Sequence, residues 1–168
     1  MTDISDVLFI CTGNIFRSLT AEYTLKHCQG LGVECQVRSA GLIEAPHEIV
    51  SFVSDYFISR SIDISRHRPQ KLTREMLNEA RLAVAMGTEH RQKVYEIYNR
   101  RLPLFSEIAY GTEEPLLDVF EVVPNWRNNE TEASAYGRSV MDYISDGMPG
   151  FISRMHTFAN LPGQTGDL

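Results

Sequence analysis

The sequence predicts an α/β fold of three layers, α/β/α, in which a four-stranded parallel sheet lies between helices on both of its faces. Three observations lead to this prediction. Short apolar segments alternate along the chain with segments whose apolar residues recur at helical spacing, which is typical of parallel sheets. The length of 168 residues suffices for one domain with a sizeable core. The hydrophobic fraction of 43% is that of an ordinary globular protein.

The N-terminal part of the chain predicts a strand, a helix and a second strand. Val7 to Ile10 is a continuous apolar run that suits a short buried strand. A helix is expected from about Arg17 to Gln29, because Gly30 and Gly32 would end it. Glu34 to Arg38 alternates between polar and apolar residues and supplies the second strand.

The middle of the chain predicts three helices and the third strand. Apolar residues recur at helical spacing from Glu48 to Arg60. A short helix is expected over Thr73 to Ala80, with Thr73 as its N-cap. Arg81 to Met86 reads as an internal strand, and Thr88 to Asn99 as a further helix.

The fourth strand is expected over Arg101 to Phe105. Pro103 should move this strand to the edge of the sheet, because proline cannot donate a ladder hydrogen bond. Glu107 to Glu132 is rich in proline, glycine, asparagine and acidic residues, and it predicts a long loop. Long loops in compact domains often carry function.

The C-terminal part of the chain predicts a last helix and a flexible tail. Helical spacing returns over Ala133 to Ala159, although Gly147 and Pro149–Gly150 should break or kink the helix. We expect one domain over residues 1–160, followed by a frayed tail over residues 161–168.

Charge and cysteine content exclude several classes of protein. A net charge of −6 argues against a nucleic-acid partner, which a basic surface would favour. Met1 to Asp6 is a poor secretion signal, and no apolar run is long enough for a membrane span. Cys11, Cys28 and Cys35 form no C-x-x-C pair, so neither a disulfide framework nor a zinc site is indicated. We expect a cytoplasmic protein with free thiols, as a monomer or a weak dimer.

The segment from Cys11 to Ser18 lies where the first strand gives way to a helix. Ligands of parallel α/β sheets bind beyond the carboxyl ends of the strands. A loop wrapped around a helix N-terminus directs its backbone N–H groups at a tetrahedral oxyanion. We expect Gly13 to allow a positive φ, which Asn14 also tolerates, and Arg17 to grip two phosphate oxygens. The predicted phosphate-binding residues are Thr12, Gly13, Asn14, Ile15, Phe16, Arg17 and Ser18.

Cys11 is the candidate nucleophile of this loop. A free thiol is only slightly ionised at neutral pH, but N–H groups, a helix dipole and a guanidinium group favour the thiolate. Ser18 is placed to donate a hydrogen bond to the sulfur. One short segment would then supply both a nucleophile and an oxyanion site for a phosphoester.

The spacing C-x5-R-S resembles the signature of the low-molecular-weight protein tyrosine phosphatases, C-x-G-N-x-C-R-S, directly after the first strand. The resemblance extends over most of the chain, through "VRSAG" at Val37 to Gly41, "IDISRHRPQKLT" at Ile62 to Thr73 and "ARLAVAM" at Ala80 to Met86. It implies four parallel strands with helices on both sides. It also implies a phosphocysteine intermediate and no metal or organic cofactor.

The resemblance implies further site residues. The family's general acid lies in a D-P-[YF] motif late in the chain, which makes Asp118 of "LLDVFE" the candidate and Phe120 the aromatic wall for a phenyl substrate. Glu113, Glu114 and Glu121 are neighbouring alternatives. In the family a serine and a histidine hold the loop asparagine. Together with Asn14 and Ser18, Ser39 and His67 would form this supporting shell.

The sequence departs from the family pattern at three places. Phe16 replaces a cysteine that, in the family, forms a reversible disulfide with the nucleophile. Val119 replaces the proline after the acid, and Ser39 to Glu48 has no aromatic residue before His47 for the entrance wall. Tyr110 and Trp126 are candidates to compensate.

Three functions follow in order of preference. The first is a phosphomonoester hydrolase, acting on phosphotyrosine in proteins or on small aryl phosphates. The second is a phosphate-binding module that has lost turnover, which the three departures motivate. The third is a thiol-coupled arsenate reductase; this chemistry needs further cysteines, and none follows Cys35.

Overall fold

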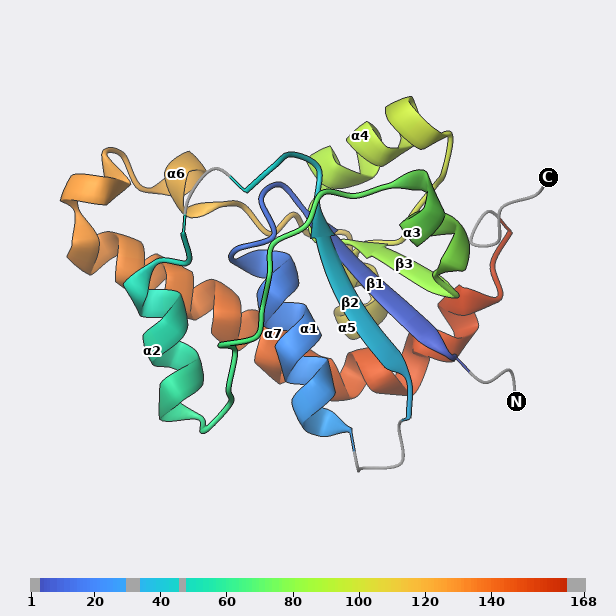
Figure 1. Ribbon diagram of the computed structural model, residues 1–168, viewed down its shortest axis with the longest axis horizontal. Coiled ribbons are helices and arrows are strands. Elements are labelled where there is room, and N and C mark those ends of the chain that lie inside the picture. The colour runs from blue at the N-terminus through green and yellow to red at the C-terminus, as the bar shows by residue number, and fades with distance from the viewer. Residues whose placement is uncertain (1–3, 30–33, 46–47, 163–168) are drawn as a thin grey trace.

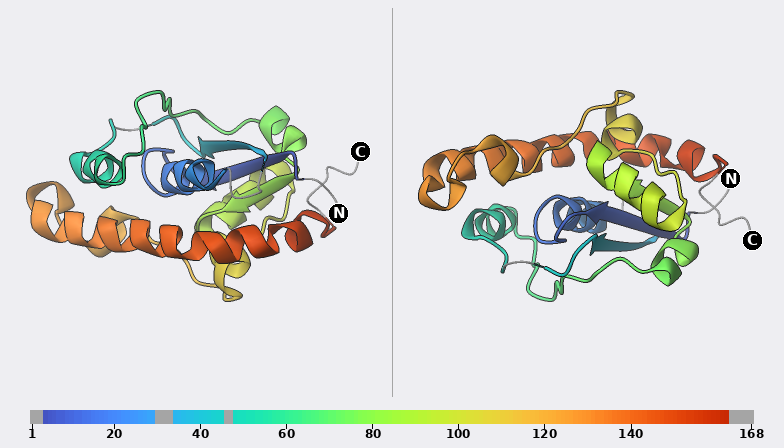
Figure 2. Two further views of the ribbon diagram at one scale, coloured as in Figure 1. Left: turned by 90° about the horizontal axis from the view of Figure 1, so that it is seen from below. Right: turned by 90° about the horizontal axis from the view of Figure 1, so that it is seen from above.

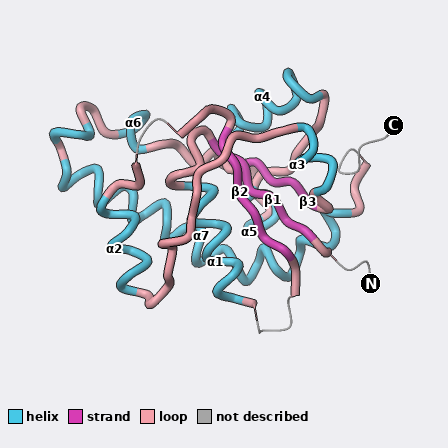
Figure 3. The backbone as a smooth tube through the Cα atoms, in the orientation of Figure 1, coloured by secondary structure: helices cyan, strands magenta, loops and turns pink. Residues whose placement is uncertain are grey.

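A computed structural model describes residues 4–29, 34–45 and 48–162 of the chain. Its sheet contains β1 (Asp6–Cys11), β2 (Gln36–Gly41) and β3 (Leu82–Ala85) in the order β2-β1-β3 (Figure 1). Both pairings are parallel. The carboxyl ends of the strands therefore meet at one edge, where Figure 3 shows the loops that follow them.

The expected fourth strand is represented by one parallel bridge, in which Leu104 pairs with Ala85 at the end of β3. The Ala85 amide donates a hydrogen bond to the Pro103 carbonyl over 3.0 Å. Pro103 has no N–H group with which to donate a further ladder hydrogen bond. The strand also ends at Leu104, because α5 (Phe105–Tyr110) begins directly after it. The fourth position of the sheet is thus occupied, but only at its edge and only briefly.

The side chains of β1 alternate between two cores, one on each face of the sheet. Val7 and Phe9 pack with α1 (Arg17–Cys28) and α7 (Glu130–Ala159). Leu8 and Ile10 pack with residues of the opposite layer, which contains α3 (Arg74–Glu79) and α4 (Thr88–Tyr98). Figure 2 shows α7 running along one side of the sheet. The predicted α/β fold with three layers is confirmed.

Helix boundaries in the middle of the chain follow the predicted ones closely. α2 (Ser51–Ser59), α3 and α4 each lie within or next to the expected ranges. Thr73 is the N-cap of α3 as predicted, since its hydroxyl accepts a hydrogen bond from the Met76 amide over 3.2 Å. β3 lies within the expected third strand.

The prediction of one long loop over Glu107 to Glu132 was wrong in part. The segment contains most of α5, then α6 (Val119–Val122) and the 3-10 helix η1 (Trp126–Asn128). These helices have one or two turns, which is too short for a repeating apolar pattern to show in the sequence. The loop between α5 and α6 remains irregular.

We expected a break or a kink in the last helix; a break was wrong, because α7 continues through Pro149. Its glycines serve close packing. A Cβ on Gly137 would lie 2.2 Å from the Phe52 ring, and one on Gly150 would lie 2.4 Å from the Ala109 carbonyl oxygen. Tertiary packing overrides the intrinsic preference of these residues. Of the predicted tail, residues 163–168 lie outside the described residues.

Candidate active site

The loop that joins β1 to α1 lies at the carboxyl edge of the sheet and begins with Cys11. Asn14 has a φ of 58°, whereas Gly13 has no positive φ, which corrects our expectation for that glycine. Gly41, at the end of β2, lies against the backbone of this loop. A Cβ there would lie 2.6 Å from the Thr12 carbonyl oxygen, so the "SAG" turn needs glycine for this close approach.

The Cys11 sulfur is buried and lies 2.9 Å from the Ser18 hydroxyl oxygen. The Asn14 side-chain amide donates to that same oxygen over 2.9 Å. Ser18 accepts from Asn14 and therefore directs its own proton toward the sulfur. A hydrogen bond to the charged form of an acid favours that form, so this arrangement stabilises a thiolate.

Three neighbouring residues fix Asn14. Its amide nitrogen donates to the Ser39 hydroxyl over 2.6 Å, and its side-chain oxygen accepts from the Gln70 amide over 3.1 Å. His67 Nε2 lies 2.7 Å from the Asn14 carbonyl oxygen. Burial lowers the pKa of His67, so the ring is neutral and donates from Nε2. The structure thus brings the four predicted supporting residues together, with Gln70 added.

The buried carboxylate of Glu22 contacts the residues that hold Asn14. The Ser39 hydroxyl donates to Glu22 of α1, and Lys26 pairs with the same carboxylate. These bonds orient the Ser39 oxygen toward Asn14. Sequence reasoning missed Glu22, although a glutamate on the inner face of a predicted helix was a signal that could have identified it.

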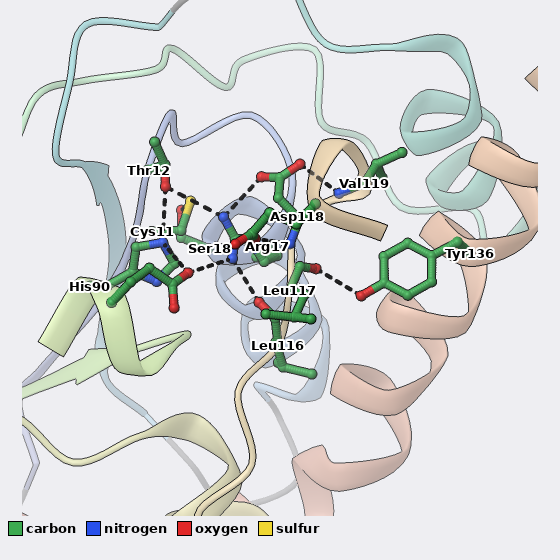
Figure 4. Close-up of polar contacts among 12 residues, drawn as sticks. Cys11, Thr12, Arg17, Ser18, His90, Leu116, Leu117, Asp118, Val119 and Tyr136 are labelled. Carbon is green, nitrogen blue, oxygen red and sulfur yellow. Dashed lines mark hydrogen bonds and ion pairs between the residues drawn. The ribbon is translucent and has the colours of Figure 1, made fainter. Parts of the chain in front are cut away.

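Arg17 is the first residue of α1, and its side chain is only 1% exposed. Its Nη1 donates to the Leu116 carbonyl over 2.6 Å and to Glu89 Oε1 over 3.1 Å. Its Nη2 donates to Asp118 Oδ2 over 2.8 Å and to Thr12 Oγ1 over 3.4 Å. Its Nε is buried without a hydrogen-bond partner among the described residues. Figure 4 shows Thr12 and Asp118 around the guanidinium group, with the Cys11 sulfur nearby.

Asp118 is the N-cap of α6, and its side chain is 23% exposed. Its Oδ1 accepts from the Val119 amide over 2.7 Å, while the Glu121 carboxylate accepts from the Asp118 amide over 2.6 Å. Tyr136 of α7 donates to the Leu117 carbonyl over 3.0 Å. This capping, together with the buried Val119, fixes the carboxylate without the proline that the family pattern has at that place.

A cavity of about 280 Å³ opens above the loop, and Phe120, which is 58% exposed, is part of its wall. The ring of Phe16 packs edge-on against Phe52 at a centroid distance of 5.9 Å. Of the two residues that we expected to compensate for the missing entrance aromatic, Trp126 lines the cavity. Tyr110 does not line it and packs on Tyr143 instead. The cavity is lined by Thr12, Gly13, Ile15, Phe16, Val50, Phe52, Asp118, Val119, Phe120, Trp126 and Arg127.

His90 is a buried residue that sequence reasoning missed. Its Nε2 lies 3.0 Å from Thr12 Oγ1 and 3.2 Å from Glu89 Oε1. Burial, reinforced by the Arg17 charge, lowers the pKa of His90 to about 2, so the ring is neutral. A single histidine at the start of a predicted helix carries no signal of such a contact.

Oxidation of Cys11 is expected to be irreversible, because the position of the second loop cysteine holds the buried Phe16 ring. Peroxide-treated protein should regain no phosphatase activity after thiol addition, and mass spectrometry should find sulfinic or sulfonic acid on Cys11. The matched variant Phe16→Cys should gain thiol-reversible inactivation. Recovery of the wild-type protein through a disulfide to Cys28 or Cys35 would contradict this prediction.

No group of three or more histidine, cysteine or carboxylate side chains suited to a metal ion occurs within the described part of the chain. None of the described helices is long and apolar enough to cross a bilayer.

Known proteins resemble the chain over most of its length. The family model for low molecular weight phosphotyrosine protein phosphatase matches residues 6–156. A protein-arginine-phosphatase of Bacillus subtilis (strain 168) is 29% identical over 120 residues, which are 68% of this chain and 79% of that protein. The low molecular weight protein-tyrosine-phosphatase Etp of Escherichia coli (strain K12) is 33% identical over 97 residues, which are 55% of this chain and 62% of that protein.

Solved structures agree with the fold. The low molecular weight protein tyrosine phosphatase from T. tengcongensis superposes with a TM-score of 0.73 at 27% identity, covering 89% of this chain and 98% of that one. A YwlE mutant from Bacillus subtilis gives a TM-score of 0.76 at 23% identity, covering 90% of this chain and 99% of that one, and so supports the fold. The chain therefore belongs to the low molecular weight phosphotyrosine protein phosphatase family and is a cysteine-dependent phosphatase.

Proposed function

We propose that the protein is a protein-tyrosine phosphatase in which Cys11 is the nucleophile, Arg17 binds phosphate and Asp118 is the general acid and base. The observation that carries this proposal is the contact of one buried guanidinium group with both Thr12 of the phosphate loop and Asp118. Cys11, Arg17 and Asp118 lie close together in Figure 4, and Thr12 and Asp118 also line the cavity, which supports this assignment.

Phosphate binds to the backbone N–H groups of Thr12 to Ser18 and to one edge of Arg17. Nη1 already donates to two acceptors, Leu116 and Glu89, and is not available. The unpartnered Nε and the exchangeable Nη2 form the other edge, which suits two oxygens of one phosphate group. Phosphate takes the place of the Asp118 carboxylate on Nη2.

The reaction proceeds in two displacements at phosphorus. The Cys11 thiolate forms an S–P bond while the ester P–O bond breaks, and protonated Asp118 gives its proton to the departing oxygen. Water then attacks phosphorus and gives a proton to Asp118, and the S–P bond breaks. The products are inorganic phosphate and the restored Cys11 thiolate, with Asp118 protonated for the next cycle.

The cavity above the loop favours an aryl phosphate. Its wall includes the aliphatic and aromatic side chains of Ile15, Phe52, Phe120 and Trp126, which bury a phenyl ring well. A groove of about 670 Å³ begins at the same place and shares Val50, Phe52, Trp126 and Arg127 with the cavity. This continuation gives residues beside the phosphotyrosine a surface to contact, which supports a protein substrate over a small aryl phosphate.

Phosphoarginine is the second candidate substrate, because two relatives are named protein-arginine-phosphatase. A guanidinium leaving group is planar and cationic, so its binding site needs carboxylates to pair with it. Among the described residues that line the cavity, Asp118 is the only carboxylate, and in the proposed mechanism it is engaged as the acid. The apolar lining therefore favours the phenyl group.

Substrate profiling tests the choice. Phosphate release is measured for three peptides of identical flanking sequence that carry phosphotyrosine, phosphoserine or phosphoarginine. We expect kcat/KM for phosphotyrosine to exceed the other two on the order of 100-fold, because the shorter serine places its ester outside the reach of Cys11 and gains nothing from the apolar wall. Faster release from the phosphoarginine peptide would reassign the substrate. Binding of vanadate by a protein that turns over none of the peptides would support the module without turnover.

A further inference from the structure

The first turn of α4 places a second carboxylate against Arg17, on the side away from Asp118. Glu89 Oε1 lies 3.1 Å from Nη1 of Arg17, and the Glu89 side chain is 41% exposed. We infer that Glu89 is a positioning residue, which holds Nη1 so that the Nε and Nη2 edge of Arg17 stays directed at phosphate. This inference rests on the proposed role of Arg17.

Gly87 makes this contact sterically feasible. A Cβ at position 87 would lie 2.6 Å and 2.8 Å from the two carboxylate oxygens of Glu89. The φ of Gly87 is −146°, an extended conformation open to any residue, so the backbone does not need glycine there. The carboxylate of Glu89 occupies the space that a side chain at position 87 would fill.

The His90 ring lies close to the Glu89 carboxylate. Nε2 of the neutral ring faces two oxygens, Glu89 Oε1 at 3.2 Å and Thr12 Oγ1 at 3.0 Å. A proton on Nε2 is donated to Thr12 Oγ1 and also attracts the nearby Glu89 carboxylate, whereas a lone pair there would face that carboxylate. The protonated nitrogen is therefore Nε2. Oε1 of Glu89 thus accepts a hydrogen bond from Arg17 and lies 3.2 Å from the His90 ring nitrogen.

The catalytic cycle creates the need for this residue. In the proposed cycle phosphate replaces Asp118 on Arg17, and when phosphate leaves, Asp118 carries a proton, so its ion pair with Arg17 is absent at that stage. A guanidinium group that is 1% exposed is costly to leave without a counter-ion. Glu89 belongs to a different element from Asp118 and takes no part in proton transfer, so it remains paired with Arg17 through the whole cycle.

The test compares four variants by kcat and KM for p-nitrophenyl phosphate and by phosphate affinity in calorimetry. Glu89→Ala should lower kcat/KM about 10-fold or more, as expected for the loss of a charge-assisted hydrogen bond. Glu89→Gln should lose less, because its amide oxygen still accepts from Nη1. Gly87→Ala should match Glu89→Ala, because it displaces the carboxylate while the charge remains. The matched control is Glu96→Ala, an exposed glutamate on the same helix, which should leave both constants unchanged.

A rescue variant separates positioning from general damage. Gly87 is the N-cap of α4, where aspartate is favoured, and a carboxylate there would enter the space that Glu89 vacates. Gly87→Asp in the Glu89→Ala background should therefore recover most of kcat/KM, with melting temperatures reporting whether each variant folds.

Two results would overturn the inference. One is a Glu89→Ala enzyme with kcat/KM within twofold of wild type; the other is tighter phosphate binding with unchanged kcat, which would show that Glu89 merely repels the anion. If the wild-type protein had no turnover, the proposed function would fail, and phosphate affinity would still decide the role of Glu89.

Discussion

Replacing Cys11 with serine is expected to abolish turnover of phosphotyrosine peptides, with a loss on the order of 10⁵-fold or more in kcat, as for other enzymes that lose their nucleophile. A serine hydroxyl is far harder to ionise than a thiol. The hydrogen bond from Ser18 stabilises an anion at position 11, but a serine there would not become one. The two side chains have nearly the same shape, so the phosphate site should persist. Release of inorganic phosphate measures the first effect, and calorimetry with phosphate the second.

Cys28→Ser is the matched control for this variant. Cys28 ends α1 at the opposite end of the helix from Arg17, and burial raises the pKa of its thiol. The control should keep wild-type kcat and KM. Turnover that survives Cys11→Ser, or that disappears with Cys28→Ser, would overturn the assignment of the nucleophile.

Asp118→Asn is expected to lower kcat for phosphotyrosine peptides about 10²- to 10⁴-fold, the usual contribution of a general acid. The loss should be smaller for p-nitrophenyl phosphate. Nitrophenolate is a weaker base than a tyrosine phenolate, so its departure depends less on protonation by an acid. KM should fall at the same time, since the neutral amide competes less well than a carboxylate for Nη2 of Arg17. Steady-state kinetics on the two substrates measures all three effects.

Glu113→Gln tests whether another carboxylate of the same segment acts instead. Glu113 pairs with Arg91 on the surface, and the variant should retain wild-type rates. Equal losses for the two substrates in Asp118→Asn would argue against proton donation to the leaving group. A large loss in Glu113→Gln would transfer the role of the acid to that residue.

The parts of the fold that were predictable from sequence depend on local patterns. The apolar run of β1, the spacing from Cys11 to Arg17 and the N-cap at Thr73 each act within a few residues. The continuity of α7 through Pro149 was not predictable, because it depends on packing against distant segments. Gly137 fits against Phe52 of α2, and no local rule reveals that contact.

The same distinction applies to the site. The loop from Cys11 to Ser18 could be interpreted because its chemistry is contiguous in sequence. Glu89, His90 and Gln70 were missed because each joins the loop across a long sequence separation, through a hydrogen bond that only the folded chain forms. Their residue types in a single sequence are those of any solvated helix or loop.

The contact between Arg17 and Asp118 has a consequence for which anions the protein admits. An incoming anion must first displace the Asp118 carboxylate from Arg17. Because this carboxylate belongs to the same chain, its effective concentration at Arg17 is high. We expect chloride to displace Asp118 poorly, whereas a doubly charged phosphoryl group that also binds the loop amides displaces it. In the proposed mechanism the Asp118 carboxylate thus has two roles: it competes with weakly bound anions for Arg17 and, once displaced, it carries a proton beside the ester oxygen.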